Sequence, residues 1–115
     1  MSRHGWIGVD LDGTLAEYDG WKGELHIGAP IGLMVERVKQ WIAEGMDVRI
    51  FTARVCGDDG RDVQLVRNVI EWWCAEHLGF VLPITNVKDQ GMTELWDDRA
   101  IQVIRNTGIR ADGAA

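Results

Sequence analysis

The chain has 115 residues, of which 46% are hydrophobic and 26% charged, with 18 acidic and 12 basic side chains. This composition is typical of one globular domain, and it excludes intrinsic disorder as the main state. No apolar run approaches the roughly 20 residues of a membrane-spanning helix, and the net charge of −6 argues against an extended binder of nucleic-acid backbones. Because it has no signal peptide and its two cysteines lack CxxC spacing, we expect a cytoplasmic protein without disulfides, structural zinc or a membrane partner.

The first predicted elements are a strand and a helix, separated by a glycine-rich segment. Residues 6–9 are an apolar run that predicts a buried strand ending at Asp10. Residues 17–29 contain an Asp-Gly pair and predict a small hairpin or a loop. A helix is predicted from Pro30 to Gly45, because apolar side chains recur at helical spacing: Ile31, Met34, Val35, Val38, Trp41 and Ile42.

The second half of the chain continues the alternation of strands and helices. Residues 48–52 predict a strand, and residues 61–78 predict an amphipathic helix. Residues 80–85 predict a third strand. Its Pro83 favours an edge or irregular position, because proline lacks the N–H that a central strand uses.

The remaining elements are short, and together with the others they indicate an α/β fold. Residues 94–96 predict a strand, while residues 100–104 are compatible with a strand or a helical turn. Alternating strands and helices indicate a parallel sheet with helices packed on its faces, and such sheets bind ligands beyond the carboxyl ends of their strands. We expect one domain over residues 1–110 and a flexible tail at 111–115.

Pairs of aspartates follow two of the predicted strands. Asp10 and Asp12 lie two residues apart, so in an extended segment their carboxylates point the same way. Asp97 and Asp98 end the last strand, where adjacent carboxylates repel each other unless a cation compensates. Mg²⁺ prefers such oxygen ligands. The alternative for each pair is a solvated turn.

Three further polar residues follow the other strands. A hydroxyl at Thr52 is placed to donate to a phosphate oxygen, and the guanidinium of Arg54 offers a fork of donors suited to phosphate. Lys88 follows the third strand, where a cation would neutralise a phosphate or a carboxylate. Taken singly, each has an ordinary structural alternative: a strand threonine, a loop arginine and a surface lysine.

Four strings of the sequence resemble the motifs of haloacid dehalogenase-like (HAD) phosphohydrolases. They occur in family order: DLDGTL at 10–15, RIFTAR at 49–54, TNVK at 85–88 and ELWDDRAI at 94–101. The chain is most similar to small members without a cap domain, including phage-type hydrolases and the phosphatase half of polynucleotide kinase-phosphatases. The resemblance implies a Rossmann-like three-layer sandwich with a mainly parallel sheet and no cap.

The same resemblance implies a Mg²⁺-dependent phosphatase that forms an aspartyl-phosphate. Asp10 would be the nucleophile, and Asp12 the general acid and then the base that activates water. Thr52 would hold the phosphoryl oxygens, Lys88 would stabilise the charged transition state, and Arg54 would contact substrate. The implied Mg²⁺ ligands are Asp10, Asp12 through its backbone carbonyl, Asp97 and Asp98, with Asp98 favoured as the direct ligand of the last pair.

The sequence leaves no room for a cap, since only fourteen residues separate Leu15 from Pro30. An open site suits a phosphorylated small molecule or a nucleic-acid end, or needs a second subunit in a homo-oligomer to close it. Core packing is the first expectation for most of four tryptophans, and covering the site or an interface is the alternative: Trp21, Trp72, Trp73 and Trp96.

Other functions remain as alternatives. A phospho-signalling receiver domain uses similar residues, but its acid pair comes early in the chain, whereas here the pair comes last. A non-catalytic Mg²⁺-binding module would keep the scaffold without turnover, although every catalytic position holds the expected residue type. A phosphotransferase to an acceptor other than water has the same sequence features as a hydrolase.

Overall fold

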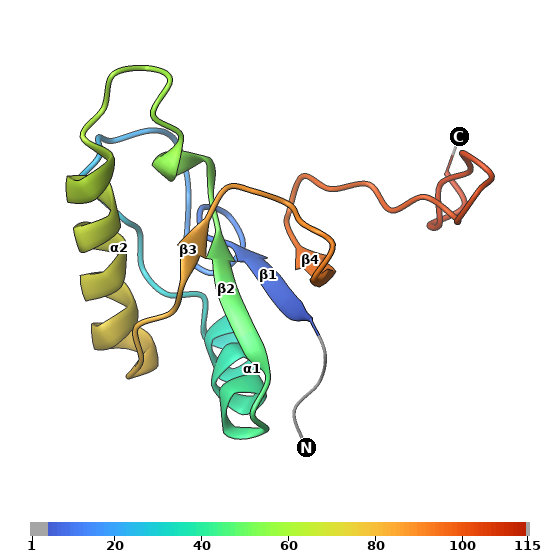
Figure 1. Ribbon diagram of the computed structural model, residues 1–115, viewed down its shortest axis with the longest axis horizontal. Helices are drawn as coiled ribbons and strands as arrows, with labels where there is room; N and C mark the ends of the chain where they lie inside the picture. Colours follow the sequence, from blue (N-terminus) through green and yellow to red (C-terminus); the bar gives the residue numbers. More distant parts are fainter. Residues whose placement is uncertain (1–4, 115) are drawn as a thin grey trace.

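The computed structural model describes residues 5–114, which form a parallel sheet, two long helices and a protruding C-terminal segment (Figure 1). None of the helices in this part of the chain is long and apolar enough to cross a membrane. The elements in chain order are β1 (Trp6–Asp10), α1 (Gly32–Ala43), β2 (Asp47–Phe51), the short 3₁₀ helix η1 (Ala53–Val55), α2 (Val63–Leu78), β3 (Ile84–Thr85) and β4 (Met92–Trp96).

The sheet has four parallel strands in the order β3-β2-β1-β4. In the register, Val9 pairs with Ile50 on one side and with Trp96 on the other. The carboxyl ends of β1, β2 and β4 therefore meet at one edge, as the alternating pattern predicted. The α/β class and the parallel sheet are confirmed.

A glycine follows each of the two helices, whereas their N-terminal ends are capped differently. α1 follows Pro30 and has no side-chain cap, whereas the carboxylate of Asp62 accepts a hydrogen bond from the N–H of Leu65 at the start of α2. Gly45 and Gly79 follow the helices with φ of +80°, the left-handed conformation that glycine adopts without strain. Both helices lie close to their predicted ranges because these signals are local.

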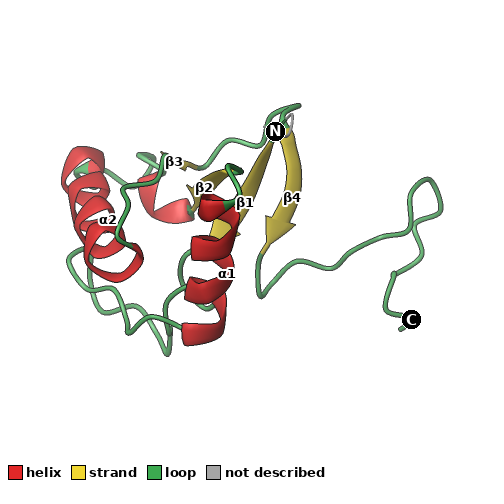
Figure 2. Cartoon of the chain, turned by 90° about the horizontal axis from the view of Figure 1, so that it is seen from below, coloured by secondary structure: helices red, strands yellow, loops and turns green. Residues whose placement is uncertain are grey.

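One core joins a single face of the sheet to both helices. Ile7 and Val9 of β1 and Val48 and Ile50 of β2 are buried in it, and both helices lie on this side (Figure 2). The helices contribute the buried side chains Met34, Val35 and Val38 from α1, and Val66, Ile70, Trp73, Cys74 and Leu78 from α2.

The opposite face of the sheet is covered differently. There Trp6 is buried, with Phe51 at 6.5 Å between ring centroids and the guanidinium of Arg49 at 4.6 Å from its ring. Residues 86–91 are the whole connection between β3 and β4, and they contain no helix. In the described residues both helices pack on one face of an all-parallel sheet, an α/β arrangement consistent with the Rossmann-like sandwich that the resemblance implied.

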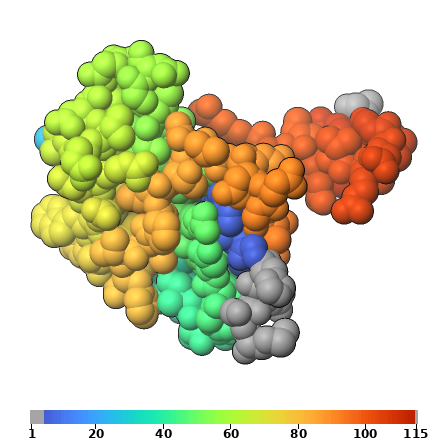
Figure 3. Space-filling model, viewed as in Figure 1, coloured from blue at the N-terminus to red at the C-terminus, as the bar shows by residue number. Residues whose placement is uncertain are grey.

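The third predicted strand is shorter than expected, and the segment that was compatible with a strand or a helical turn is neither. The strand predicted at 80–85 is reduced to Ile84–Thr85 at the sheet edge, where the carbonyl of Pro83 still accepts a hydrogen bond from the N–H of Ile50 at 2.8 Å. Residues 100–104 form neither strand nor helix, and only Val103 makes an isolated bridge, to Arg110. This part of the chain projects from the body (Figure 3).

Candidate functional site

Three aspartates meet at the carboxyl edge of the sheet. Asp10 ends β1, and Asp97 and Asp98 follow the neighbouring strand β4. Each offers one carboxylate oxygen, and these three oxygens lie within 4.8 Å of one another. The neighbouring ends of two parallel strands thus bring together acids that are 87 or more positions apart in the chain.

The turn after β1 fixes this acidic cluster. The hydroxyl of Thr14 lies 3.4 Å from carboxylate oxygens of both Asp10 and Asp98, and it accepts a hydrogen bond from the N–H of Asp98 at 3.0 Å. Gly13 has a φ of +92°, and a Cβ there would lie 2.6 Å from Oδ2 of Asp98. The backbone can pass this close to Asp98 only without a side chain at position 13.

Asp10 lies in crowded acidic surroundings that disfavour its charged form. Burial, and after it the nearby carboxylates of Asp97 and Asp98, together raise the pKa of Asp10 to about 7. A divalent cation between the three carboxylates would relieve this repulsion. Three carboxylate oxygens at this spacing fit the hard oxygen ligation that Mg²⁺ prefers.

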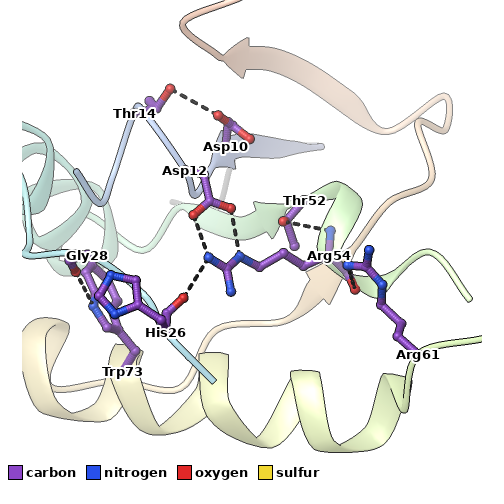
Figure 4. A network of polar contacts seen from close by, with 9 residues as sticks. All are labelled: Asp10, Asp12, Thr14, His26, Gly28, Thr52, Arg54, Arg61 and Trp73. Carbon is purple, nitrogen blue, oxygen red and sulfur yellow. Dashed lines mark hydrogen bonds and ion pairs between the residues drawn. The ribbon is translucent and has the colours of Figure 1, made fainter. Parts of the chain in front are cut away.

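Asp12 makes a different contact. Its two carboxylate oxygens accept hydrogen bonds from Nε and Nη2 of Arg54, at 2.7 and 2.8 Å (Figure 4). Nη2 also donates to the backbone carbonyl of His26 at 2.8 Å. Arg54 is 5% exposed, and its Nη1 is buried without a hydrogen-bond partner. The side chain of Asp12 is thus held by an arginine and is not part of the three-aspartate group.

Thr52 links the end of β2 to this arrangement. It is buried at the start of η1, where its hydroxyl accepts a hydrogen bond from the N–H of Arg54 at 3.1 Å. Its own N–H donates to the carbonyl of Thr85 on β3 at 3.0 Å. The short helix η1 therefore fixes both Thr52 and Arg54 beside Asp12.

A cavity of about 380 Å³ opens over these residues. Trp21 forms one wall of this cavity. The guanidinium groups of Arg54 and Arg61 make cation–π contacts with it, at 4.9 and 5.4 Å from the centre of its ring. The lining comprises acidic, basic, aromatic and small residues: Asp10, Asp12, Asp97, Arg54, Arg61, Arg99, Tyr18, Trp21, Phe51, Thr52 and Ala53.

The sequence patterns missed several of these residues. The motif resemblance assigns no role to Arg61 or to Arg99. Tyr18 lies in a loop, where no periodic pattern of apolar residues singles it out. Trp21 is 50% exposed and lines the cavity, so it covers the site and does not pack in the core. Trp73 follows the first expectation and is buried, whereas Trp72 is exposed.

Of the predicted site residues, Asp98 and Lys88 do not line the cavity; Asp98 still belongs to the aspartate group, whereas Lys88 lies apart from it. Lys88 is exposed and is absent from the cavity lining. It lies in the short connection 86–91, whose Asp89 accepts a hydrogen bond from Nε1 of Trp6 at 2.8 Å. Trp6 begins β1, at the edge of the sheet opposite the aspartates, so this connection already leads away from the site.

The comparisons with known proteins bear on the fold. A solved structure of a conserved protein from Bacteroides thetaiotaomicron matches 85% of this chain and 78% of its own, with a TM-score of 0.57 and 23% sequence identity. At this identity the likeness shows a shared fold and nothing further. No protein-family model matches the chain, and neither does any curated protein.

Proposed function

We propose that this protein is a Mg²⁺-dependent phosphomonoester hydrolase of the HAD type. The observation that carries the proposal is the group of carboxylates from Asp10, Asp97 and Asp98, within 4.8 Å of one another beside Asp12 and Thr52. Phosphoryl transfer asks mainly for positioning and charge neutralisation, and this edge of the sheet offers both.

The metal would be held by one carboxylate oxygen from each of the three aspartates. Mg²⁺ supplies charge neutralisation, which lets the Asp10 carboxylate approach an anionic phosphate. Asp12 would add only its backbone carbonyl, as the family resemblance implies, because its side-chain oxygens are taken by Arg54.

The reaction begins with attack by an Asp10 carboxylate oxygen on phosphorus, in line with the leaving oxygen. A new O–P bond forms on Asp10 as the ester O–P bond breaks, and the leaving oxygen takes a proton from Asp12. Water activated by Asp12 then cleaves the aspartyl-phosphate and releases inorganic phosphate. The hydroxyl of Thr52 is placed to bind a phosphoryl oxygen.

Asp12 must carry a proton before it can act as the acid, so its bidentate pair with Arg54 has to open first. A phosphate entering the cavity offers Arg54 an alternative anionic partner of matching geometry. The unpartnered Nη1 of Arg54 adds a further donor. Arg54 would thereby exchange its ion pair with Asp12 for an ion pair with the substrate phosphate.

The cavity favours a phosphate ester with a planar leaving group. Tyr18 and Trp21 are 41% and 50% exposed at this cavity, next to Arg61. Aromatic and guanidinium planes stack on nucleobases. A nucleotide or a nucleic-acid end is the substrate class that this wall suits, in a single-stranded form given the acidic chain.

Hydrolysis of an aryl phosphate in Mg²⁺ tests the proposal. Asp10→Asn removes the nucleophile and should abolish turnover while the protein stays folded. Asp47→Asn, at the opposite end of β2 and paired with Arg49 at 2.9 Å, is the matched control and should keep full activity. Wild-type protein inert toward aryl phosphates, nucleotides and phosphorylated oligonucleotides would contradict the proposal. Mg²⁺ binding without turnover would instead support a non-catalytic or phospho-signalling module.

A further inference from the structure

Trp21 lies at the tip of a loop, residues 17–29, that is fixed at its base. There the N–H of Glu17 donates to the carbonyl of Ala29 at 2.8 Å. At the tip, Trp21 lies between Gly20 and Gly23, and a Cβ on either glycine would meet no atom within 4 Å. The backbone of the tip is thus loosely packed. Its place over the cavity therefore depends on a few contacts, those of the Trp21 ring among them.

Arg54 contacts this loop at two points. Its Nη2 donates to the backbone carbonyl of His26 at 2.8 Å (Figure 4), and its guanidinium carbon lies over the ring of Trp21, 4.9 Å from the ring centre. Arg61 supports the arrangement from the other side of η1, because its Nη1 donates to the carbonyl of Arg54 at 3.2 Å while its guanidinium lies 5.4 Å from the same ring centre. The loop and Arg54 therefore hold each other in place through two separate contacts.

One donor of Arg54 is kept away from water. Arg54 is 5% exposed, and in the described part of the chain its Nη1 is buried without a hydrogen-bond partner. Such a donor is costly, because it has lost its water without gaining an acceptor. The electron-rich face of the Trp21 ring offsets part of that cost for the cation. An anionic acceptor that reaches Nη1 relieves the cost and has no water to displace from it.

We propose that Trp21 is a positioning residue for phosphate binding and that it acts through Arg54. This inference rests on the proposed function, in which a substrate phosphate replaces Asp12 as the partner of Arg54. That exchange breaks the two hydrogen bonds to Asp12, whereas the Trp21 ring and the His26 carbonyl remain as partners of the guanidinium. Trp21 thus keeps Arg54 ordered in the cavity when its carboxylate partner is lost. A guanidinium that is ordered in advance loses less conformational entropy when it binds phosphate.

Inorganic phosphate separates this role from stacking on a nucleobase, because phosphate has no leaving group for the ring to stack on. Isothermal titration calorimetry of the full chain with phosphate at saturating Mg²⁺ is the measurement. Trp21→Ala should weaken phosphate binding about tenfold, because it lets water reach the Arg54 guanidinium. Trp21→Phe keeps an aromatic face and should restore most of the affinity. Trp72→Ala is the matched control, since Trp72 is 75% exposed on α2 and does not line this cavity, and it should leave the affinity unchanged.

A double-mutant cycle tests whether Trp21 acts through Arg54. Arg54→Lys keeps the positive charge but lacks the planar fork that stacks on the ring, so adding Trp21→Ala to it should change phosphate affinity by less than about threefold. Circular dichroism checks that each variant is folded. Unchanged phosphate affinity in Trp21→Ala, or equal losses in the wild-type and Arg54→Lys backgrounds, overturns this proposal alone. Wild-type protein that binds no phosphate at saturating Mg²⁺ overturns it together with the proposed function.

Discussion

Arg54 holds both carboxylate oxygens of Asp12, at 2.7 and 2.8 Å, across 42 positions of sequence. The arginine is 5% exposed and the aspartate side chain 20%. The pair joins the turn after β1 to the short helix after β2, and so it ties together the two strand ends that form the candidate site. The pair stabilises the fold at this point, and under the proposed function a substrate phosphate has to replace Asp12 as the partner of Arg54.

The first prediction concerns the stability that this pair provides. Arg54→Ala leaves the Asp12 carboxylate without its partner and the carbonyl of His26 without its donor, so the unfolding free energy should fall by about 3 kcal/mol. Urea denaturation measures it. Lys22→Ala breaks the exposed pair with Asp19 and should lower the unfolding free energy far less, because solvent screens that pair. Equal losses for the two variants would show that the buried pair contributes no more than a surface pair.

A second prediction concerns pH and Mg²⁺. The pKa of Asp10 is raised from 3.8 to about 7 in the folded chain, so between these values the folded chain binds the extra proton. The unfolding free energy of the metal-free protein should therefore fall as pH rises from about 4 to about 7 and level off above that. Since Asp10 is half-buried, solvent reduces the effect, and we expect a fall in melting temperature on the order of 5 °C.

Mg²⁺ competes with that proton for Asp10. The ion should therefore raise the melting temperature at pH 8 and have little effect at pH 5, which differential scanning calorimetry measures. In Asp10→Asn both the pH dependence contributed by Asp10 and most of the Mg²⁺ response should disappear. A Mg²⁺ response equal at the two pH values would place the ion away from Asp10.

Gly13 provides a third prediction. Gly13→Ala adds a Cβ 2.6 Å from Oδ2 of Asp98 at a φ of +92°, so it should displace Asp98 and weaken Mg²⁺ binding about tenfold or more. Gly45→Ala is the matched control, because its φ is +80° but a Cβ there meets no atom within 4 Å. Both variants should lose about 1 kcal/mol of stability to backbone strain. Calorimetric titration with Mg²⁺ separates them, and unchanged affinity in Gly13→Ala would mean that Asp98 is not a ligand.

The sequence predicted well what depends on local signals and strand order. The apolar spacing of α1 and α2, and the run at β1, are properties of neighbouring residues, and parallel strand order alone places Asp10 and Asp97 at one edge. The proximity of Asp10, Asp97 and Asp98 follows from these two facts.

What the sequence could not supply is the geometry of long-range contacts and short connections. No spacing rule indicates that Arg54 binds Asp12 rather than solvent, or that Trp21 lies against Arg54 and Arg61. The path of residues 86–91 depends on how β3 and β4 sit on opposite sides of β2 and β1. That path decides the place of Lys88, and a motif match does not encode it.

The last prediction separates the arginines of the cavity from Lys88. If the site works as it is arranged here, Lys88→Met should change kcat/KM for an aryl phosphate by less than about twofold, because Lys88 is exposed and does not line the cavity. Arg61→Met removes a cation from the cavity wall and should lower kcat/KM roughly tenfold, mainly through KM, because the lost charge attracts the phosphate equally in the ground state and in the transition state. Steady-state kinetics of both variants with saturating Mg²⁺ decide the matter. A Lys88→Met variant that loses kcat while Arg61→Met keeps it would mean that residues 86–91 move toward Asp10 during turnover, and that the lysine role implied by the HAD resemblance is exercised in a conformation other than this one.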